Sequence, residues 1–389
     1  MAITISSADK ALKTYYLDAV AEQLNTKINP FLAQIKQTSN DVFGKEVRKL
    51  VVTGHTGGIV AGDETSDLPS AYSNKYEQFV SKLKNLYGRI EISDKVIRAS
   101  QNDSGAFLNL LNAEMEGLVK ASENVLGKMI YGNGKGYLGA VLSDFSETEY
   151  YVDNVNNFEA GMELAVCNID KVIIPDSLRV VSVDKSKGTI TCEGDATSII
   201  LQGYSFYQKG VGEKQLTGIE AIFDDSVTTL YGLNKASNPW LKPYVRTNAN
   251  TLTQEMIQKA IDVTEENSGS QPNIILCSFG VRRALQKLFA SNRCITDVVD
   301  LDGGYKAISY NGIPIVADRF CPNGTMYLLN TNDFTMNQLC DWQWLETDNG
   351  KILQQVPGKP VYTATLVKYA ELMCSRPCGQ AKISGITEA

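Results

Sequence analysis

One stretch of the sequence combines residue types that could perform chemistry. In Asn311–Asn330 (NGIPIVADRFCPNGTMYLLN), two apolar runs flank a turn that carries Asp318, Arg319 and Cys321. A carboxylate and a thiol beside a guanidinium could serve acid–base or nucleophilic catalysis. The stretch also fits a hairpin, because Pro322 presets φ and the Asn-Gly pair after it tolerates the positive φ of a tight reversal. We interpret it as a hairpin with polar residues at its bend.

Other candidates for chemistry are sparse. His55 is the only histidine, and it lies in a glycine-rich segment that offers nothing local to hold a general base. Gly134–Gly139 (GKGYLG) has the letters of a dinucleotide-binding loop, but it follows a predicted helix and precedes no clear one, so we expect a helix-terminating loop. Eight scattered cysteines without a C-x-x-C pair favour buried, reduced thiols over zinc. We therefore predict no catalytic, cofactor or metal site; an enzyme using Cys321 or Asp318 is the alternative.

Composition narrows the class of protein further. The chain has 389 residues, a net charge of −7 and 43% hydrophobic residues, which suffices for two or three globular domains. No run of Lys and Arg exceeds two residues, which argues against sequence-specific binding of nucleic acid. No apolar run approaches the roughly 18 residues of a membrane span, and the N-terminus lacks a signal-peptide layout. We expect a protein that is made and kept in a cytoplasm.

The coarse pattern of elements is distinctive in its order. Apolar residues at helical spacing predict a helix over about Leu12–Leu24, and a glycine-rich excursion occupies Val51–Pro69. From Ser104, apolar residues recur every three or four positions for about 27 residues, which predicts a long helix of roughly 40 Å. Residues 145–219 read as β-strands and turns. The last third alternates helix and strand and ends in a long strand-like run from Pro360.

The order of these elements and three stretches of sequence resemble the major capsid proteins of tailed bacteriophages with the Hong Kong 97-type fold. The stretches are Met129–Val141 (MIYGNGKGYLGAV), Leu216–Asp225 (LTGIEAIFDD) and Tyr310–Phe334. The resemblance implies an α+β fold with peripheral and axial domains and an inserted small β domain. The implied parts are an N-terminal arm (1–48), an extended loop (49–92), a spine helix with part of the peripheral domain (93–145), an inserted β-rich domain (146–220), an axial domain (221–360) and a closing strand of the peripheral domain (361–389).

The resemblance also implies a function without catalysis. Members of this family form hexamers and pentamers that close an icosahedral or prolate shell around double-stranded DNA, which they contact non-specifically. The implied partners are the chain itself, with scaffold, portal and decoration proteins as further candidates and no membrane. The implied location is the virion, after assembly in the cytoplasm of a bacterial host. Lys75, Lys82 and Lys84 match no crosslinking motif of the family. An encapsulin shell around cargo enzymes is the nearest alternative.

Overall fold

The computed structural model describes residues 29–54, 59, 61, 70, 72–95, 104–144, 148–170, 172–195, 200–291, 298–301, 305–346 and 351–388. The helix expected over Leu12–Leu24, His55 and most of the excursion Val51–Pro69 lie outside these residues. Among the described helices, none combines the length and the apolar character that a membrane crossing requires.

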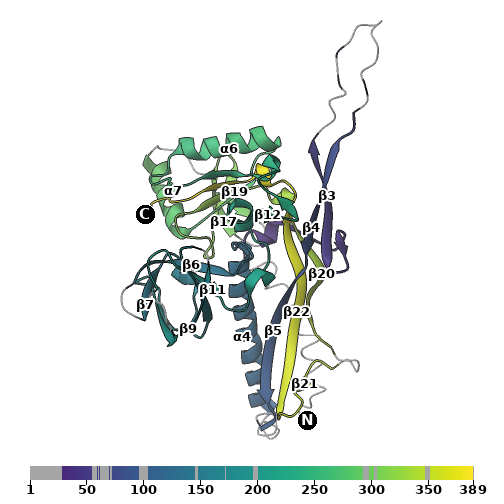
Figure 1. Ribbon diagram of the computed structural model, residues 1–389, viewed down its shortest axis with the longest axis vertical. Helices are drawn as coiled ribbons and strands as arrows, with labels where there is room; N and C mark the ends of the chain where they lie inside the picture. Colours follow the sequence, from purple (N-terminus) through teal and green to yellow (C-terminus); the bar gives the residue numbers. More distant parts are fainter. Residues whose placement is uncertain are drawn as a thin grey trace.

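A tall five-stranded sheet forms one half of the molecule (Figure 1). Its strands are β1 (Lys36–Thr38), β5 (Lys84–Ser93), β20 (Phe334–Trp344), β21 (Gln354–Gln355) and β22 (Val361–Cys374). Helix α4 (Ser104–Ile130), 27 residues long, runs beside β5. Alternation along β5 buries Leu86, Ile90 and Ile92. A Cβ on Gly88 would lie 2.8 Å from Leu118 Cδ1, so strand and helix pack closely at this glycine.

A closed six-stranded barrel follows α4 and stands beside it in Figure 1. Its strands are β6 (Tyr137–Asp144), β7 (Glu149–Val152), β8 (Glu163–Cys167), β9 (Ile173–Asp184), β10 (Thr189–Asp195) and β11 (Ser205–Gln208). Strands β9 and β10 are the expected pair, and they reverse at Gly188, whose φ is +75°. Phe158, Leu164 and Phe206 fill the interior. The barrel begins at Tyr137 rather than near the expected boundary at 146, because β6 follows the glycine loop directly.

A seven-stranded mixed sheet carries two helices and forms the upper body (Figure 1). In spatial order its strands are β14 (Tyr244–Arg246), β23 (Ala381–Ile383), β19 (Met326–Leu329), β15 (Ile274–Cys277), β18 (Ile313–Ala317), β17 (Tyr305–Tyr310) and β16 (Val298–Leu301). Helix α6 (Gln254–Ser268) begins where the Thr253 hydroxyl accepts a hydrogen bond from Met256 N, and it ends at Gly269 in the left-handed region. Helix α7 (Phe279–Ser291) follows β15.

The expected domain boundaries need two corrections in this body. Strand β20 lies inside the expected axial range 221–360, but it pairs with β22 in the five-stranded sheet. Strand β23 lies inside the expected closing segment 361–389, but it pairs with β19 in the seven-stranded sheet. The reason is that the chain crosses between the two sheets twice, after β19 and again after β22, which sequence periodicity does not reveal.

A three-stranded sheet projects from the body (Figure 1). It consists of β2 (Val42–Phe43), β3 (Glu46–Gly54) and β4 (Lys75–Lys82), and β3 and β4 form a long hairpin. The remaining described elements are η3 (Leu32–Gln34), η5 (Val155–Asn157), η6 (Gly212–Lys214), α5 (Glu220–Phe223), β12 (Thr229–Leu230), β13 (Leu233–Asn234), η7 (Pro239–Leu241), η8 (Thr331–Asp333) and η9 (Pro377–Gly379).

Candidate assembly surfaces and the junction between the sheets

The polar turn singled out in the sequence joins β18 to β19 and is buried. It is not the expected hairpin: β15 lies between these two strands and pairs with both, so the turn crosses the end of β15. Sequence periodicity could not show this, because β15 comes from an earlier part of the chain. The side chain of Asp318 is only 4% exposed, and its carboxylate accepts hydrogen bonds from Tyr131 Oη and Phe320 N, both at 3.0 Å. Burial raises the pKa of Asp318, and both hydrogen bonds oppose that rise. Because Tyr131 follows α4 directly, this carboxylate fixes the end of the long helix against the upper sheet.

Cys321 is packed rather than poised for reaction. Its Sγ atom lies 3.6 Å from the carbonyl oxygen of Thr325, and the side chain is buried. Burial raises the pKa of the thiol well above its usual range, and the Asp318 charge adds to that effect. A nucleophilic cysteine needs the thiolate form, so this environment favours a packing role for Cys321 over the enzyme alternative. Arg319 lies over the Phe320 ring, with its guanidinium carbon 4.5 Å from the ring centroid.

The same turn meets α4 at a glycine. A Cβ on Gly127 would lie 2.2 Å from the ring of Phe320, far inside contact distance. The helix and the turn are therefore as close as two backbones allow with an aromatic ring between them. The loop Gly134–Gly139, which has dinucleotide-motif letters, leads from α4 into β6, and Gly134 and Gly136 have φ values of +83° and +80°. A strand in place of a helix confirms its interpretation as a helix-terminating loop.

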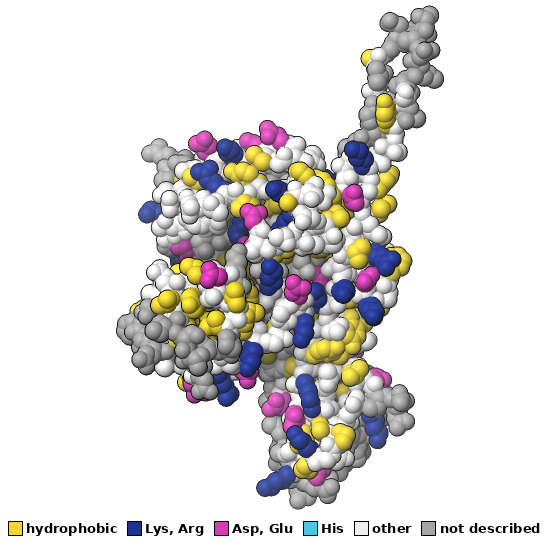
Figure 2. Space-filling model, viewed as in Figure 1, with side chains coloured by type: hydrophobic (Ala, Val, Ile, Leu, Met, Phe, Trp, Pro, Cys, Tyr) yellow, Lys and Arg dark blue, Asp and Glu magenta, His cyan; other side chains and the backbone are white. Residues whose placement is uncertain are grey.

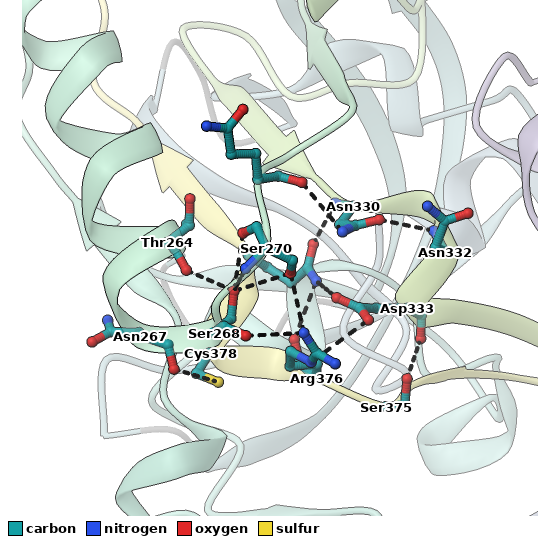
Figure 3. A network of polar contacts seen from close by, with 12 residues as sticks. Thr264, Asn267, Ser268, Ser270, Asn330, Asn332, Asp333, Ser375, Arg376 and Cys378 are labelled. Atoms are coloured by element: carbon teal, nitrogen blue, oxygen red, sulfur yellow. Dashed lines mark hydrogen bonds and ion pairs between the residues drawn. The ribbon is translucent and has the colours of Figure 1, made fainter.

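A polar network ties together the two crossings between the sheets (Figure 3). The first crossing contains Asn330 and Asp333, and the second contains Ser375, Arg376 and Gln380. Ser375 N donates to the Asp333 carbonyl oxygen at 2.8 Å. Asn330 N donates to Gln380 Oε1 at 2.9 Å, and Gln380 Nε2 donates to Asp333 Oδ2 at 3.1 Å. Burial raises the pKa of Asp333, and the nearby Arg376 charge opposes it.

Arg376 extends this network to the end of α6. Its Nη1 donates to the carbonyl oxygen of Ser268 at 2.9 Å and to Ser270 Oγ at 3.2 Å. A cation at a helix C-terminus is favourable because the last carbonyl groups carry partial negative charge. In Figure 3 the arginine lies between the helix end and Asp333. The two sheets are thus linked through paired backbone crossings and hydrogen bonds, which makes the junction a fixed corner.

The projecting hairpin has two unlike faces. On one face Phe79 is fully buried, and its ring lies 5.7 Å from Trp240 and 5.2 Å from Tyr231. The other face carries Leu50, Val52 and Tyr76, which are 65%, 48% and 52% exposed. The register places Val52 directly opposite Tyr76, and Leu50 lies two residues along the same strand, so these three side chains share a face. Figure 2 shows hydrophobic side chains along this arm.

A cleft of about 440 Å³ lies between the hairpin and the junction. Residues 50–54 of β3 form one wall, and the opposite side includes Trp240, Ser268 and Arg376. The exposed apolar strip therefore continues toward a recess with polar groups at its other wall. A flat apolar surface beside a recess of this kind is typical of protein–protein contacts.

A second apolar surface lies at one end of the barrel. Ile169, Val172, Ile173 and Leu201 are each at least half exposed. The first three lie in the loop before β9 and at its first residue, and Leu201 lies in the loop before β11. The loops touch, because a Cβ on Gly203 would lie 3.5 Å from Ile169 Cδ1. The sequence pattern did not single out either this cluster or the hairpin strip, since strand alternation cannot tell a face that packs inside the chain from one left exposed.

Comparison with solved structures gives the class of the fold. The chain resembles the capsid subunit of cyanophage A-1(L), with a TM-score of 0.56, 12% identity and coverage of 97% of this chain and 95% of that one. It also aligns with the holo-SrpI encapsulin of Synechococcus elongatus PCC 7942 (TM-score 0.48, 10% identity, 99% and 96% covered). A capsid chain of a native GTA particle gives a TM-score of 0.47 at 10% identity, with 92% and 90% covered. The cyanophage likeness shows a capsid protein fold.

Sequence comparison points the same way. Residues 198–351 match the family described as SU10 major capsid protein, a segment that runs from the end of the barrel through the upper body to β20. A search of curated proteins finds no match. The family match over these residues, and the fold shared with the cyanophage subunit, support the resemblance of the chain to tailed-phage major capsid proteins with the Hong Kong 97-type fold. This confirms the resemblance drawn from Leu216–Asp225 and Tyr310–Phe334.

Proposed function

We propose that this chain assembles with copies of itself, as hexamers and pentamers, into a closed icosahedral or prolate shell around double-stranded DNA. The observation that carries the proposal is the hairpin β3–β4, anchored on one face by Phe79 and exposing Leu50, Val52 and Tyr76 on the other. A projecting arm with an unburied apolar face is costly in a monomer, but it supplies intersubunit area where a neighbour covers it.

The arm also fits the geometry of a shell. An arm that covers a different surface on the next copy makes a head-to-tail contact, and such contacts close into rings when the rotation between copies permits. Each contact can be weak, because a ring engages many of them at once and the effective concentration of the next arm is high. The five-stranded sheet, α4 and the fixed junction would hold all arms of a ring at one angle.

The remaining parts of the proposal follow from charge and from the residues at the polar turn. The net charge of −7 suits a container that encloses DNA without reading its sequence. We assign no catalytic role, since Asp318 and Cys321 are used in packing. Scaffold, portal and decoration proteins are proposed as partners, and the proposed place of assembly is the host cytoplasm, with the virion as the final location.

Electron microscopy of the purified chain tests self-assembly. A variant of the hairpin gives the more specific test. Leu50→Asp combined with Val52→Asp should leave a folded subunit and remove closed particles, because each charge would have to be desolvated at the contact. Leu50→Met with Val52→Ile keeps the apolar face and should retain particles. Particles of normal yield in the Asp variant would contradict the role of the hairpin. Particles from infected cells that hold protein cargo and no DNA would favour the encapsulin alternative.

A further inference from the structure

A fully buried carboxyl group lies where the barrel connects to the upper body. Glu371 of β22 has no exposed surface, and its Oε1 accepts a hydrogen bond from Thr217 N at 3.0 Å. Its Oε2 has no partner among the described residues. Burial raises the pKa of this carboxyl to about 7, and the Thr217 hydrogen bond and the charge of Lys84 act in the opposite direction. Near neutral pH the group is therefore close to the point where it gains or loses its proton.

Asn337, the residue paired with Glu371, also has a buried oxygen without a partner among the described residues. In the β20–β22 ladder Asn337 is directly paired with Glu371, so the two side chains leave the sheet on the same face. Asn337 is also fully buried, and its Nδ2 donates to the backbone oxygen and hydroxyl of Thr335. Its Oδ1 has no partner among the described residues. Two buried acceptors on paired residues thus lack a donor among the described residues, and each unmet acceptor carries a desolvation cost.

A proton on Glu371 would give both unmet acceptors, Glu371 Oε2 and Asn337 Oδ1, a hydrogen bond. A protonated carboxyl has an O–H donor, and Oε2–H can donate to Asn337 Oδ1 while Oε1 still accepts from Thr217 N. Without the proton, the buried carboxylate keeps the single hydrogen bond from Thr217 N, and its Oε2 has no donor among the described residues. An incompletely paired buried charge is far more costly than a neutral pair of the same shape.

The segment that Glu371 holds connects three parts of the molecule. Thr217 lies in Leu216–Ile219, between η6 at the barrel and α5 in the upper body. Ile219 N donates to the carbonyl oxygen of Ile130 at 2.7 Å, which caps the end of α4. A Cβ on Gly218 would lie 2.3 Å from the carbonyl oxygen of Met129, so this segment fits tightly against the helix end. Any loosening at Glu371 acts on this connection.

We propose that Glu371 is a proton-controlled latch: protonated, it bridges Asn337 of β20 and Thr217 of the linking segment, and ionised, it weakens the hold of β22 on that segment. The proposal concerns the folded chain and does not depend on shell formation. It gives the corner between barrel, α4 and sheets a response to pH.

Two other groups act on the latch. Lys84 of β5 is the nearby cation, and its Nζ donates to the carbonyl oxygen of Glu213 at 2.5 Å. Tyr231 is buried close by, its hydroxyl accepts from Cys374 N at 3.0 Å, and the Glu371 charge contributes to raising its pKa. Because the pKa of Glu371 is raised on folding, its contribution to stability is fully present below the ordinary value of 4.5 and is lost as pH rises through about 7.

Thermal unfolding of the full chain across this window tests the latch. The wild-type midpoint should fall between about pH 5 and pH 8, in proportion to the loss of the proton. Glu371→Gln should remove this fall and keep the midpoint at the high-pH end above that of the wild type. The reason is that a glutamine amide can donate to Asn337 Oδ1 and accept from Thr217 N at every pH.

Two further variants separate the latch from a general effect of charge. Glu266→Gln removes an exposed carboxylate of α6 and should keep the wild-type pH dependence. Asn337→Leu removes the acceptor for the proton and should lower the midpoint most at low pH, where the bridge exists. Difference infrared spectroscopy should show a protonated carboxyl band in the wild type that Glu371→Gln lacks. An unchanged pH dependence in Glu371→Gln, or no fall in the wild type, would overturn the proposal.

Discussion

The β18–β19 turn and the β3–β4 hairpin are both strand reversals, yet they treat their side chains in opposite ways. The turn buries Asp318 and Cys321 and gives each a contact, although polar groups would be cheaper at the surface. The hairpin exposes Leu50 and Val52, although apolar groups would be cheaper inside. The turn therefore satisfies its side chains within one chain. The hairpin keeps an apolar face that a second chain can cover.

The physical reason lies in what surrounds each reversal. The turn lies between the end of α4 and the upper sheet, so water is excluded and every polar atom there needs a partner from the chain. The hairpin lies at the side of the upper body (Figure 1), and its Phe79 face packs against Trp240. Variants in the two regions should therefore separate folding from assembly, and the following predictions run from the largest expected effect to the smallest.

Gly127→Ala should be the most damaging single change at the turn. The added methyl group would overlap the buried Phe320 ring, so the helix or the ring must move, at about 3 kcal/mol in the free energy of unfolding. Gly117→Ala is the matched control on the same helix, because nothing lies within 4 Å of its Cβ position. That control should stabilise by about 0.5–1 kcal/mol through helix propensity. Denaturant unfolding measures both, and equal effects would refute the close packing at Gly127.

Val47→Ala and Val52→Ala compare the two faces of β3 directly. Val47 is fully buried and Val52 is 48% exposed, and they lie on opposite faces of the strand. Loss of buried methyl groups at Val47 should cost about 2 kcal/mol of unfolding free energy. The same change at Val52 should alter the free energy of unfolding by no more than about 0.5 kcal/mol. It should lower the yield of particles instead. If Val52→Ala destabilises the isolated subunit as much as Val47→Ala, the two-faced description of the hairpin is wrong.

Tyr131→Phe should have the smallest effect of the three. It removes the hydroxyl that donates to Asp318 Oδ2 and leaves that acceptor buried, at about 1 kcal/mol of unfolding free energy. The pKa of Asp318 should rise further, because this hydrogen bond opposes the effect of burial. The loss should therefore be larger at high pH, where the carboxylate is charged, than at low pH. Unfolding curves at the two extremes test this, and a loss that is independent of pH would exclude the proposed role of Tyr131.

Much of the local structure was predictable from the residues. The long helix from Ser104 and the strand Ile274–Cys277 follow from periodicity, and the structure contains both. The hairpin expected after Ile313 is wrong, because β15 lies between β18 and β19 and pairs with each of them. The enzyme alternative required Cys321 or Asp318 to be accessible, and both are buried. The closing strand begins at Val361 as expected, but the barrel begins at Tyr137, and the ranges 221–360 and 361–389 each contain a strand of the other sheet. Sequence periodicity does not reveal this, because a chain that changes sheets keeps the same strand pattern on both sides of the crossing.

The sequence by itself determined the elements, the capsid resemblance and the turn at Pro322, because these depend on neighbours along the chain. Tertiary structure alone decided which polar residues lie opposite one another in the interior. Glu371 and Asn337 are 34 residues apart in the sequence, and only the β20–β22 register makes them opposite one another. It also decided that one face of the hairpin packs and the other stays exposed. Both outcomes depend on burial, which arises only when distant segments remove water from a surface.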